Sequence, residues 1–381
     1  MSAPLLVRGD GWTVREAGPD DDAALCRLFA DVHLKAALDL TQERDPSFFV
    51  LPRLHQARFA TTAGFDDDGR LVGCGTLISR PGHDAAQDRV VETGYLCDLR
   101  VAPGFRGGVH LARAYGEVMR WAGERFGTEL FTTVIFDSNQ AARRALVERS
   151  PKRAEQPVYR PMTPFEMISV QLTTPRPPPA RPVRAAGPAD RGALVEFLAR
   201  QSRRRLLGEV LDDARFAERL ALWPGLALED FLLVHDARGA IVGACAPWDT
   251  SAFKRTRVLG YHGAMRAQRW AFDLAARVRG FATLPRPGDV FRFSFLTHLE
   301  VVDDDPAVLA ALLRAAYAKL LPTRAHFFAV FLPRGSRLAE GFRGFTTTRT
   351  AMTLYAVHAP DSPWAAREVR TLHPGFEMAL S

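Results

Sequence analysis

Apolar residues along the chain alternate between two spacings, one typical of strands and one typical of helices. Between Val109 and Phe126 they recur three and four positions apart, which predicts a helix with one apolar face. Short apolar stretches at Val90–Val101 and Leu130–Phe136 flank this segment and predict strands. A strand, a helix and a strand in this order indicate an α/β or α+β protein.

The same patterns extend from Trp12 to Leu172. A helix is expected to begin at Pro19, because the acidic residues that follow it suit a first helical turn. The other elements predicted for this part are strands at Trp12–Glu16, Phe59–Phe65, Arg70–Ser79 and Phe165–Leu172, and a helix at Gln140–Glu148.

An internal repeat shows that this pattern occurs twice. Residues 14–25 (VREAGPDDDAAL) resemble residues 183–194 (VRAAGPADRGAL) at an offset of 169. The offset is 170 between Gly69 and Gly239, and 200 between Asp98 and His298. One fold present twice, with about 30 extra residues in the second copy, explains these offsets. The extra residues include a segment with helical spacing, Met265–Ala282.

The repeat divides the chain into predicted domains. Residues 1–173 form the first domain, and residues 183–358 form the second, with a helical insert near 248–288. Between them, residues 174–182 contain five prolines, a composition that favours an extended linker. The tail at 359–381 lies outside the repeat.

Composition narrows the class of protein. The hydrophobic fraction of 47% and the charged fraction of 24% are ordinary for a globular protein. The formal net charge is +7, but the arginines are spread among acidic residues, so we expect no nucleic-acid partner. No apolar segment has the length of a membrane span or the layout of a signal peptide. The four cysteines lack metal-site spacing, which favours reduced thiols, no metal and a cytoplasmic location.

The segment LRVAPGFRGG at residues 99–108 carries the most specific chemistry. It joins a predicted strand to a predicted helix through glycines, and such a junction presents backbone N–H groups to an anion. With Asn139 and Ala142 further on, it resembles the GNAT superfamily of CoA-dependent N-acyltransferases. The resemblance covers Trp12–Leu172. It implies two GNAT-like domains, each a mixed, mostly antiparallel twisted sheet flanked by helices, with the second copy degenerate in motif.

The resemblance also implies a site for acetyl-CoA or a longer acyl-CoA as co-substrate. The strand end at Leu99 and Val101 is expected to pair with the pantetheine arm. Asn139 is expected to bond to the same arm. The pyrophosphate is expected to bind the N–H groups of the residues from the loop into the helix: Arg106, Gly107, Gly108, Val109, His110 and Leu111.

Three positions depart from the family pattern. Val109 and Leu111 stand where the motif usually has glycine, and Leu146 replaces the tyrosine that commonly protonates the leaving thiolate. Proton transfer is therefore expected from the strand before the loop, where the candidates are Glu92, Tyr95 and Asp98. Each also has a purely structural interpretation. Glu92 could be a strand-edge charge, Tyr95 a core aromatic, and Asp98 a group that orients a helix N-terminus.

The acceptor is expected to bind near residues 43–49. Arg44 and Asp45 suit a polar acceptor, while Phe48 and Phe49 either wall its apolar part or are core aromatics. In the second copy, Asp303 and the two aspartates after it would repel a pyrophosphate. This copy is expected to be structural or to shape the acceptor site.

The sequence therefore predicts an N-acyltransferase that uses direct attack of a primary amine in a ternary complex. One alternative is a fatty-acyl transferase that acylates an amino acid or peptide side chain and takes its chain from CoA or an acyl carrier protein. Another is a non-catalytic sensor or scaffold. The acceptor is a small molecule or a peptide amine, and the chain is expected to be a monomer or a homodimer.

Overall fold

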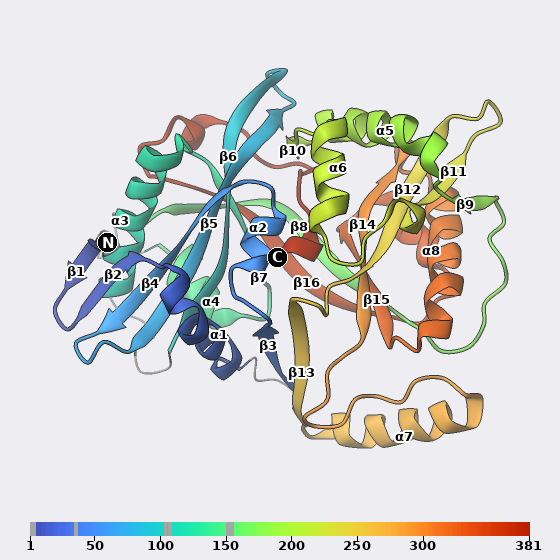
Figure 1. Cartoon of the computed structure of the whole chain (residues 1–381), viewed down its shortest axis with the longest axis horizontal. Helices are drawn as coiled ribbons and strands as arrows, with labels where there is room; N and C mark the ends of the chain where they lie inside the picture. Colours follow the sequence, from blue (N-terminus) through green and yellow to red (C-terminus); the bar gives the residue numbers. More distant parts are fainter. Residues whose placement is uncertain (1–4, 34–36, 103–104, 106–108, 150–155) are drawn as a thin grey trace.

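A computed structural model of the chain describes residues 5–33, 37–102, 105, 109–149 and 156–381; the side chains of 109–113 lie outside this description. Two similar halves lie side by side and share one large sheet (Figure 1). The strands of the first half are β1 (Leu5–Gly9), β2 (Trp12–Glu16), β3 (Leu38–Arg44), β4 (Arg58–Asp66), β5 (Leu71–Asp84), β6 (Arg89–Val101), β7 (Phe131–Phe136) and β8 (Val158–Gln171). Its helices are α1 (Asp22–Asp31), α2 (Val50–Leu54), α3 (Val109–Phe126) and α4 (Gln140–Ala142), which a π turn at Arg143–Val147 continues.

The second half follows the same order of elements and adds a helical insert and a C-terminal tail. Its strands are β9 (Val183–Ala185), β10 (Leu206–Glu209), β11 (Leu232–His235), β12 (Ile241–Asp249), β13 (Lys254–Tyr261), β14 (Phe293–Val301), β15 (Phe327–Pro333) and β16 (Thr347–His358). Its helices are α5 (Arg191–Arg203), α6 (Asp213–Leu222), α7 (Ala264–Arg279) and α8 (Pro306–Leu320). Helix α7 lies in the insert that the repeat predicts, and the tail adds short 3-10 turns at Pro363–Ala366 and Met378–Leu380.

The repeat is visible in side-chain contacts as well as in element order. Before α1, the Arg15 guanidinium binds the carboxylate of Asp21 at 2.7 Å, and the Gly18 N–H donates to the same carboxylate at 2.8 Å. Before α5, Arg184 and Gly187 make the same two contacts with Asp190, at 2.6 and 2.8 Å. The sequence match at an offset of 169 thus encodes one turn built twice.

The sheet confirms the predicted α+β fold class, but its strands are shared between the halves. Its order is β1-β2-β4-β5-β6-β7-β16-β8-β15-β14-β12-β11-β9, with β10 attached to β5. Strand β16 of the second half therefore covers the edge of β7, while β8 of the first half lies between β16 and β15. In sequence terms, each half ends in a strand that completes the sheet of the other.

Two further strand pairs connect the first half to the second half. Strand β3 of the first half pairs with β13 of the second half, and β10 of the second half pairs with the far end of β5. Among the strand pairs that the structure describes, β6–β7 and β14–β15 are parallel and the others are antiparallel. These two parallel pairs occupy equivalent places in the two halves.

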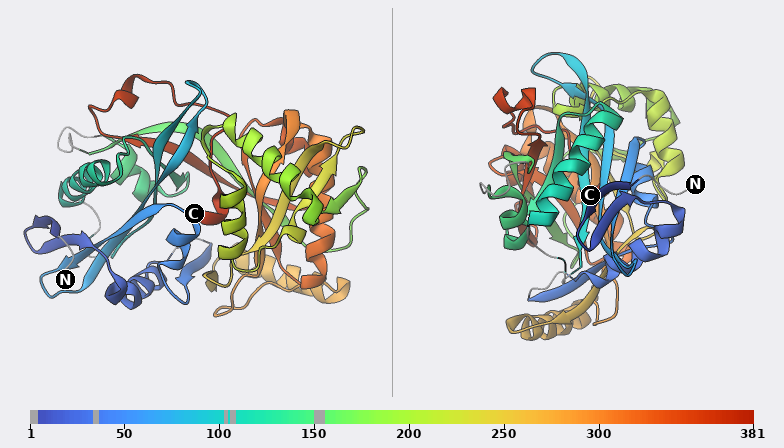
Figure 2. Two further views of the ribbon diagram at one scale, coloured as in Figure 1. Left: turned by 45° about the horizontal axis from the view of Figure 1, so that its top comes forward. Right: turned by 90° about the vertical axis from the view of Figure 1, so that its left-hand side faces the viewer.

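Helices cover the faces of this sheet (Figure 2). Helix α3 buries Ala114, Val118, Met119, Ala122 and Phe126, which lie on one face at helical spacing. Burying a side chain such as Val118 or Met119 contributes about 1.5–3 kcal/mol. Helix α8 begins where Asp305 caps it by accepting a hydrogen bond from the Ala307 N–H at 2.8 Å, directly before Pro306.

Candidate functional site

The two parallel strands β6 and β7 stay together for only two residue pairs. Gly94 lies opposite Phe131, and Tyr95 lies opposite Thr132. A Cβ atom at Gly94 would lie 2.0 Å from the Phe131 ring, so the close approach of the strands requires glycine here. The Thr133 hydroxyl then donates to the Leu96 carbonyl at 2.8 Å, and the ladder ends. An opening between diverging strands therefore begins just beyond Tyr95.

A β-bulge shapes the wall of this opening on β6. Asp98 has a φ of 56°, which is unusual for a residue other than glycine. Opposite it, the register with β5 shifts between Cys74 and Thr76, so the ladder is interrupted at Asp98 and Leu99. The bulge redirects the backbone of β6 three residues before the strand ends at Val101.

A buried ion pair holds the bulge. Arg44 donates from Nη2 to the Asp98 carboxylate at 2.7 Å, and the two side chains are 1% and 3% exposed. The Arg44 guanidinium also lies 4.6 Å from the centre of the Phe29 ring, a cation–π distance. Its Nε and Nη1 atoms are buried, and within the described residues they have no hydrogen-bond partner. Arg44 and Asp98, predicted separately as acceptor-binding and catalytic residues, therefore contact each other directly.

Tyr95 lies in the last residue pair before β6 and β7 diverge. Its side chain is close to residues of the C-terminal tail. Its ring is 5.6 Å from that of Phe376 and 6.0 Å from that of His55. Burial raises the pKa of its hydroxyl well above 10, while a hydrogen bond with Ser381 opposes this. The hydroxyl is therefore neutral at physiological pH.

Lys254 reaches this region from the second half, and sequence analysis did not identify it as a site residue. It lies opposite Arg44 in the β3–β13 ladder. Its Nζ donates to the main-chain oxygens of Ser381 and Ala379, at 2.7 and 3.0 Å. Burial, and then the charge of Arg44, lower its pKa to about 7. A lysine with this pKa is a candidate base, but only the pairing of β3 with β13, which the sequence did not reveal, brings it to the bulge.

His55 helps to fix the tail beside Tyr95. Its Nε2 atom lies 3.0 Å from the Leu380 carbonyl oxygen, in a fully buried position. Burial, and then the charge of Arg80, lower the pKa of His55 to about 3. The ring is therefore neutral and holds Leu380 by a hydrogen bond, which keeps the last residues of the tail in the centre of the molecule (Figure 1).

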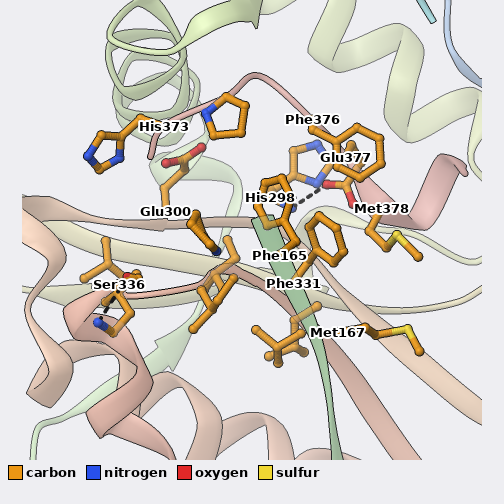
Figure 3. A pocket seen from close by; sticks show the side chains of 18 of the residues that line it. Phe165, Met167, His298, Glu300, Phe331, Ser336, His373, Phe376, Glu377 and Met378 are labelled. Atoms are coloured by element: carbon orange, nitrogen blue, oxygen red, sulfur yellow. Dashed lines mark hydrogen bonds between the residues drawn. The ribbon is translucent and has the colours of Figure 1, made fainter. Parts of the chain in front are cut away.

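The equivalent opening in the second half is partly occupied by the tail. Strands β14 and β15 diverge after Phe295 and Ala329, and His298 occupies the bulge position with a φ of 52°. The Glu377 carboxylate accepts hydrogen bonds from the His298 N–H at 3.2 Å and from the Thr297 hydroxyl at 2.7 Å (Figure 3). The tail thus satisfies the bulge backbone of this half with a carboxylate of its own.

A cavity of about 130 Å³ remains beside this contact. Its walls combine apolar side chains, with Phe165, Phe331 and Phe376 among them, and charged ones (Figure 3). Glu300 also lines it, binds Arg205 at 2.5 Å and has a pKa raised by burial, which the charge of Arg205 opposes. Phe376, which lines this cavity, is also the residue whose ring contacts Tyr95.

The structure separates the third catalytic candidate from the other two. Glu92 points to the opposite face of β6 from Tyr95, because side chains alternate along a strand. It accepts a hydrogen bond from the Ser79 hydroxyl at 2.9 Å and pairs with Arg58 at 3.2 Å. Its surroundings are those of a strand-edge charge.

The predicted acceptor residues have distinct environments. Asp45 pairs with Arg255 at 2.8 Å. Phe48 is fully buried and Phe49 is nearly so, in a core cluster that includes Phe29. Arg44 and Asp45 thus lie at the boundary between the halves, whereas the two phenylalanines pack in the core.

The predicted CoA-binding residues are described only in part. Arg106, Gly107 and Gly108 lie outside the described residues, as do the side chains of Val109, His110 and Leu111, whose backbone forms the first turn of α3. Leu99 is 41% exposed at the bulge. Asn139 caps α4 by accepting from the Ala142 N–H at 3.1 Å.

Comparison with known proteins places this geometry in a family. Residues 24–149 match the model of the Acetyltransferase (GNAT) family, and this range contains β6, the bulge and α3. This part of the chain belongs to the GNAT superfamily. No curated protein matches it by sequence. The predicted resemblance is therefore confirmed for the part of the chain that carries the motif.

Solved structures extend the GNAT fold to both halves. A GCN5-related N-acetyltransferase from Sphaerobacter thermophilus is 16% identical, with a TM-score of 0.55, over 98% of this chain and 99% of that chain. N-myristoyltransferase from Saccharomyces cerevisiae, solved with bound myristoyl-CoA, is 11% identical, with a TM-score of 0.61, over 98% of this chain and 90% of that chain. At these identities the likeness establishes the fold.

Two other classes of site have no counterpart among the described residues. No helix in the described part of this GNAT chain has both the length and the apolar character needed to cross a membrane. Among the same residues, no group of three or more His, Cys, Asp or Glu side chains is arranged to hold a metal ion.

Proposed function

We propose that this GNAT protein transfers an acyl group from acyl-CoA to a primary amine, and that the first half performs the reaction. The observation that carries the proposal is the opening between β6 and β7, which lies beside the Asp98 bulge and close to the start of α3. In the matching opening of the second half, the Glu377 carboxylate from the tail accepts a hydrogen bond from the His298 N–H of the bulge. In the first half, Arg44 holds the bulge residue Asp98 instead, so the two copies differ at this point of the fold.

The backbone beside the bulge suits the pantetheine arm and the reacting carbonyl. The edge of β6 from Leu99 to Val101 would pair with the arm, and the Asn139 side chain would bond to it from the far wall. N–H groups in residues 106–111 would bind the pyrophosphate at the start of α3. The Leu99 N–H, at the interruption of the ladder, would stabilise the oxyanion that forms when the amine attacks the thioester.

Two side chains near the opening suit the proton transfers of this reaction. The attacking amine has to be neutral, and Lys254, with its pKa of about 7, would accept a proton from it at neutral pH. The departing thiolate needs a proton, and the neutral Tyr95 hydroxyl would supply it. No covalent enzyme intermediate is needed, because donor and acceptor meet in a ternary complex.

A long acyl donor is the second candidate. Yeast N-myristoyltransferase shares the two-copy fold over nearly the whole chain and was solved with myristoyl-CoA. In this chain, Phe376 contacts Tyr95 and also lines a cavity whose walls include Phe165 and Phe331. This arrangement supports a fatty-acyl transferase that acylates an amino acid or peptide amine.

The experiment measures donor binding and transfer on the full chain. Thermal stability would be recorded with CoA, acetyl-CoA and myristoyl-CoA, followed by release of free CoA thiol with a panel of primary amines. A donor at 100 times its Kd stabilises the fold by about 2.7 kcal/mol. We expect this stabilisation to disappear in Arg106→Ala and to persist in the matched control Arg343→Ala, whose side chain is 82% exposed in the second half.

Three results would contradict the proposal. If none of the thioesters binds, an acyl carrier protein becomes the donor to test. If the donor binds but no amine releases CoA, the protein is a sensor or scaffold. If Arg343→Ala weakens binding as much as Arg106→Ala does, the site does not lie in the first half.

A further inference from the structure

Helix α7 projects from the body of the protein and has no counterpart in the first half. In Figures 1 and 2 it lies apart from the large sheet, at the end of strand β13. Its inner face is attached by Met265, which packs in a small cluster with Val258, and by Arg269, whose guanidinium lies 5.0 Å from the Tyr261 ring centre. This attachment leaves the opposite face of the helix turned to solvent.

The outer face of α7 is apolar. Trp270, Leu274 and Val278 are 70%, 49% and 79% exposed. They are spaced four residues apart, which puts them in one stripe along the helix. Two small residues, Ala267 and Ala271, are exposed beside them. A contiguous stripe on one helix indicates an interaction surface, whereas isolated exposed apolar residues do not.

The exposed charge around this stripe is positive. Arg266, Arg277 and Arg279 are exposed on the same helix. The acidic residue of the helix, Asp273, is turned inward, where it accepts a hydrogen bond from the Leu284 N–H and lies 3.6 Å from Arg269. An apolar stripe with a basic border is the pattern of a helix that lies in a membrane interface.

We propose that α7 docks on the surface of an anionic phospholipid bilayer, with the Trp270–Leu274–Val278 stripe at the boundary between headgroups and acyl chains. Tryptophan is enriched at this boundary, and each arginine near the surface is attracted by anionic lipid. A second copy of the chain fits less well. A single stripe of three large side chains is small beside the ~800 Å² per partner that a stable protein interface buries.

The test uses the full-length protein and vesicles of two compositions. Co-sedimentation would be measured with vesicles of phosphatidylcholine and with vesicles that contain 30% phosphatidylglycerol, in ~0.1 M salt. We expect binding to the anionic vesicles and at least tenfold weaker binding to the neutral ones. Brominated lipid should quench tryptophan fluorescence in the wild type, and Trp270→Phe should remove most of that quenching.

Variants separate the stripe from the rest of the surface. The triple variant Trp270→Glu, Leu274→Glu, Val278→Glu should lose vesicle binding. The matched control Val90→Glu, at a residue that is 53% exposed on β6, should keep it. Arg266→Gln and Arg277→Gln should each weaken binding about fivefold. Circular dichroism and thermal unfolding would confirm that each variant is folded, because Glu is a good helix former on an exposed face.

Two outcomes would overturn the proposal. In one, the wild type does not bind anionic vesicles, or the triple variant binds them as well as the wild type does. In the other, the wild type sediments as a dimer without lipid and the triple variant as a monomer, which would assign the stripe to a second copy of the chain. The measurement needs no acyl-CoA, so its outcome does not depend on the proposed acyltransferase activity.

Discussion

Asp98 and His298 belong to different halves of the chain and lie at the same position of the fold. Each is the bulge residue of the strand that starts the opening in its half, with φ values of 56° and 52°. Each also contacts an arginine, at 2.7 Å for Asp98 with Arg44 and at 3.0 Å for His298 with Arg219. The chemistry differs, because Asp98 is half of a buried ion pair, whereas burial lowers the pKa of His298 to about 3 and keeps it neutral.

The Arg44–Asp98 pair should be costly to break and much less costly to replace as a whole. Arg44→Met leaves a buried carboxylate without its partner, and Asp98→Asn leaves a buried guanidinium, so each should lower the free energy of unfolding by about 3–5 kcal/mol. The double variant Arg44→Met, Asp98→Asn should recover much of that loss. Urea unfolding measures all three. Arg343→Ala, in an exposed pair, should change stability by less than about 1 kcal/mol.

Additive losses in the double variant would show that the two side chains do not act as a pair. That result would require another role for the contact that holds the bulge.

Tyr95→Phe should reduce catalysis without reducing donor binding. The hydroxyl is proposed to protonate the leaving thiolate, a step for which general acids contribute about 100-fold or more. We therefore expect kcat to fall by about that factor while the Kd for acyl-CoA stays within about twofold. The control is Glu92→Gln, on the opposite face of the same strand, which should retain kcat. Equal losses of kcat in the two variants would remove the special role of Tyr95.

Lys254 should make stability depend on pH above neutrality. Its pKa falls from 10.5 in the unfolded chain to about 7 in the folded protein. Between these values the unfolded state holds a proton that the folded state lacks, so the free energy of unfolding rises with pH, by at most about 1.4 kcal/mol per pH unit. Below pH 7 Lys254 is protonated in both the folded and the unfolded state. The folded state then bears the whole free-energy cost of burying this charge.

Replacing Lys254 by Met should remove this dependence. Urea unfolding at pH 7, 8 and 9 should show the wild type gaining stability relative to Lys254→Met as pH rises. Lys319→Met, at a surface lysine paired with Asp230, serves as the control. Parallel stability curves for the wild type and Lys254→Met would contradict the lowered pKa.

Glu377 should hold the tail in place. Its carboxylate accepts from the Thr297 hydroxyl and from the His298 backbone, and Glu377→Ala leaves the His298 N–H without this acceptor, which costs about 1–3 kcal/mol. Hydrogen exchange of residues 372–381 should become faster in this variant, while α3 stays protected. The control is Asp361→Ala, at an exposed position of the tail. Unchanged exchange in the tail would mean that Leu380 and its neighbours fix it without Glu377.

Local patterns predicted the elements well. The helix Val109–Phe126 was predicted with the bounds that α3 has, and the helical insert was found from a jump in the repeat offset. These features depend on periodicity within one segment, which the sequence records directly. Strand β3 was missed. It belongs to a two-stranded sheet whose other strand, β13, comes from the second half of the chain.

Long-range features of the candidate site were harder to predict. Tyr95 and Asp98 could be predicted because they lie just before a local motif. Arg44, the partner of Asp98, was predicted only as an acceptor-binding residue. Lys254 and the tail carry no sequence signal for the site, because the pairing of distant strands brings them there. The same alternation of apolar residues in β8 and β16 fits either half, so it could not reveal that these strands are exchanged.

The exchange of β8 and β16 has a consequence for biosynthesis. Strand β7 is translated long before β16, the strand that covers its edge and the last strand of the second half. The sheet of the first half therefore stays incomplete on the ribosome until most of the second half has emerged. Gene fragments cut at the linker would each encode an exposed strand edge. We expect them to aggregate when made separately and to assemble when co-expressed.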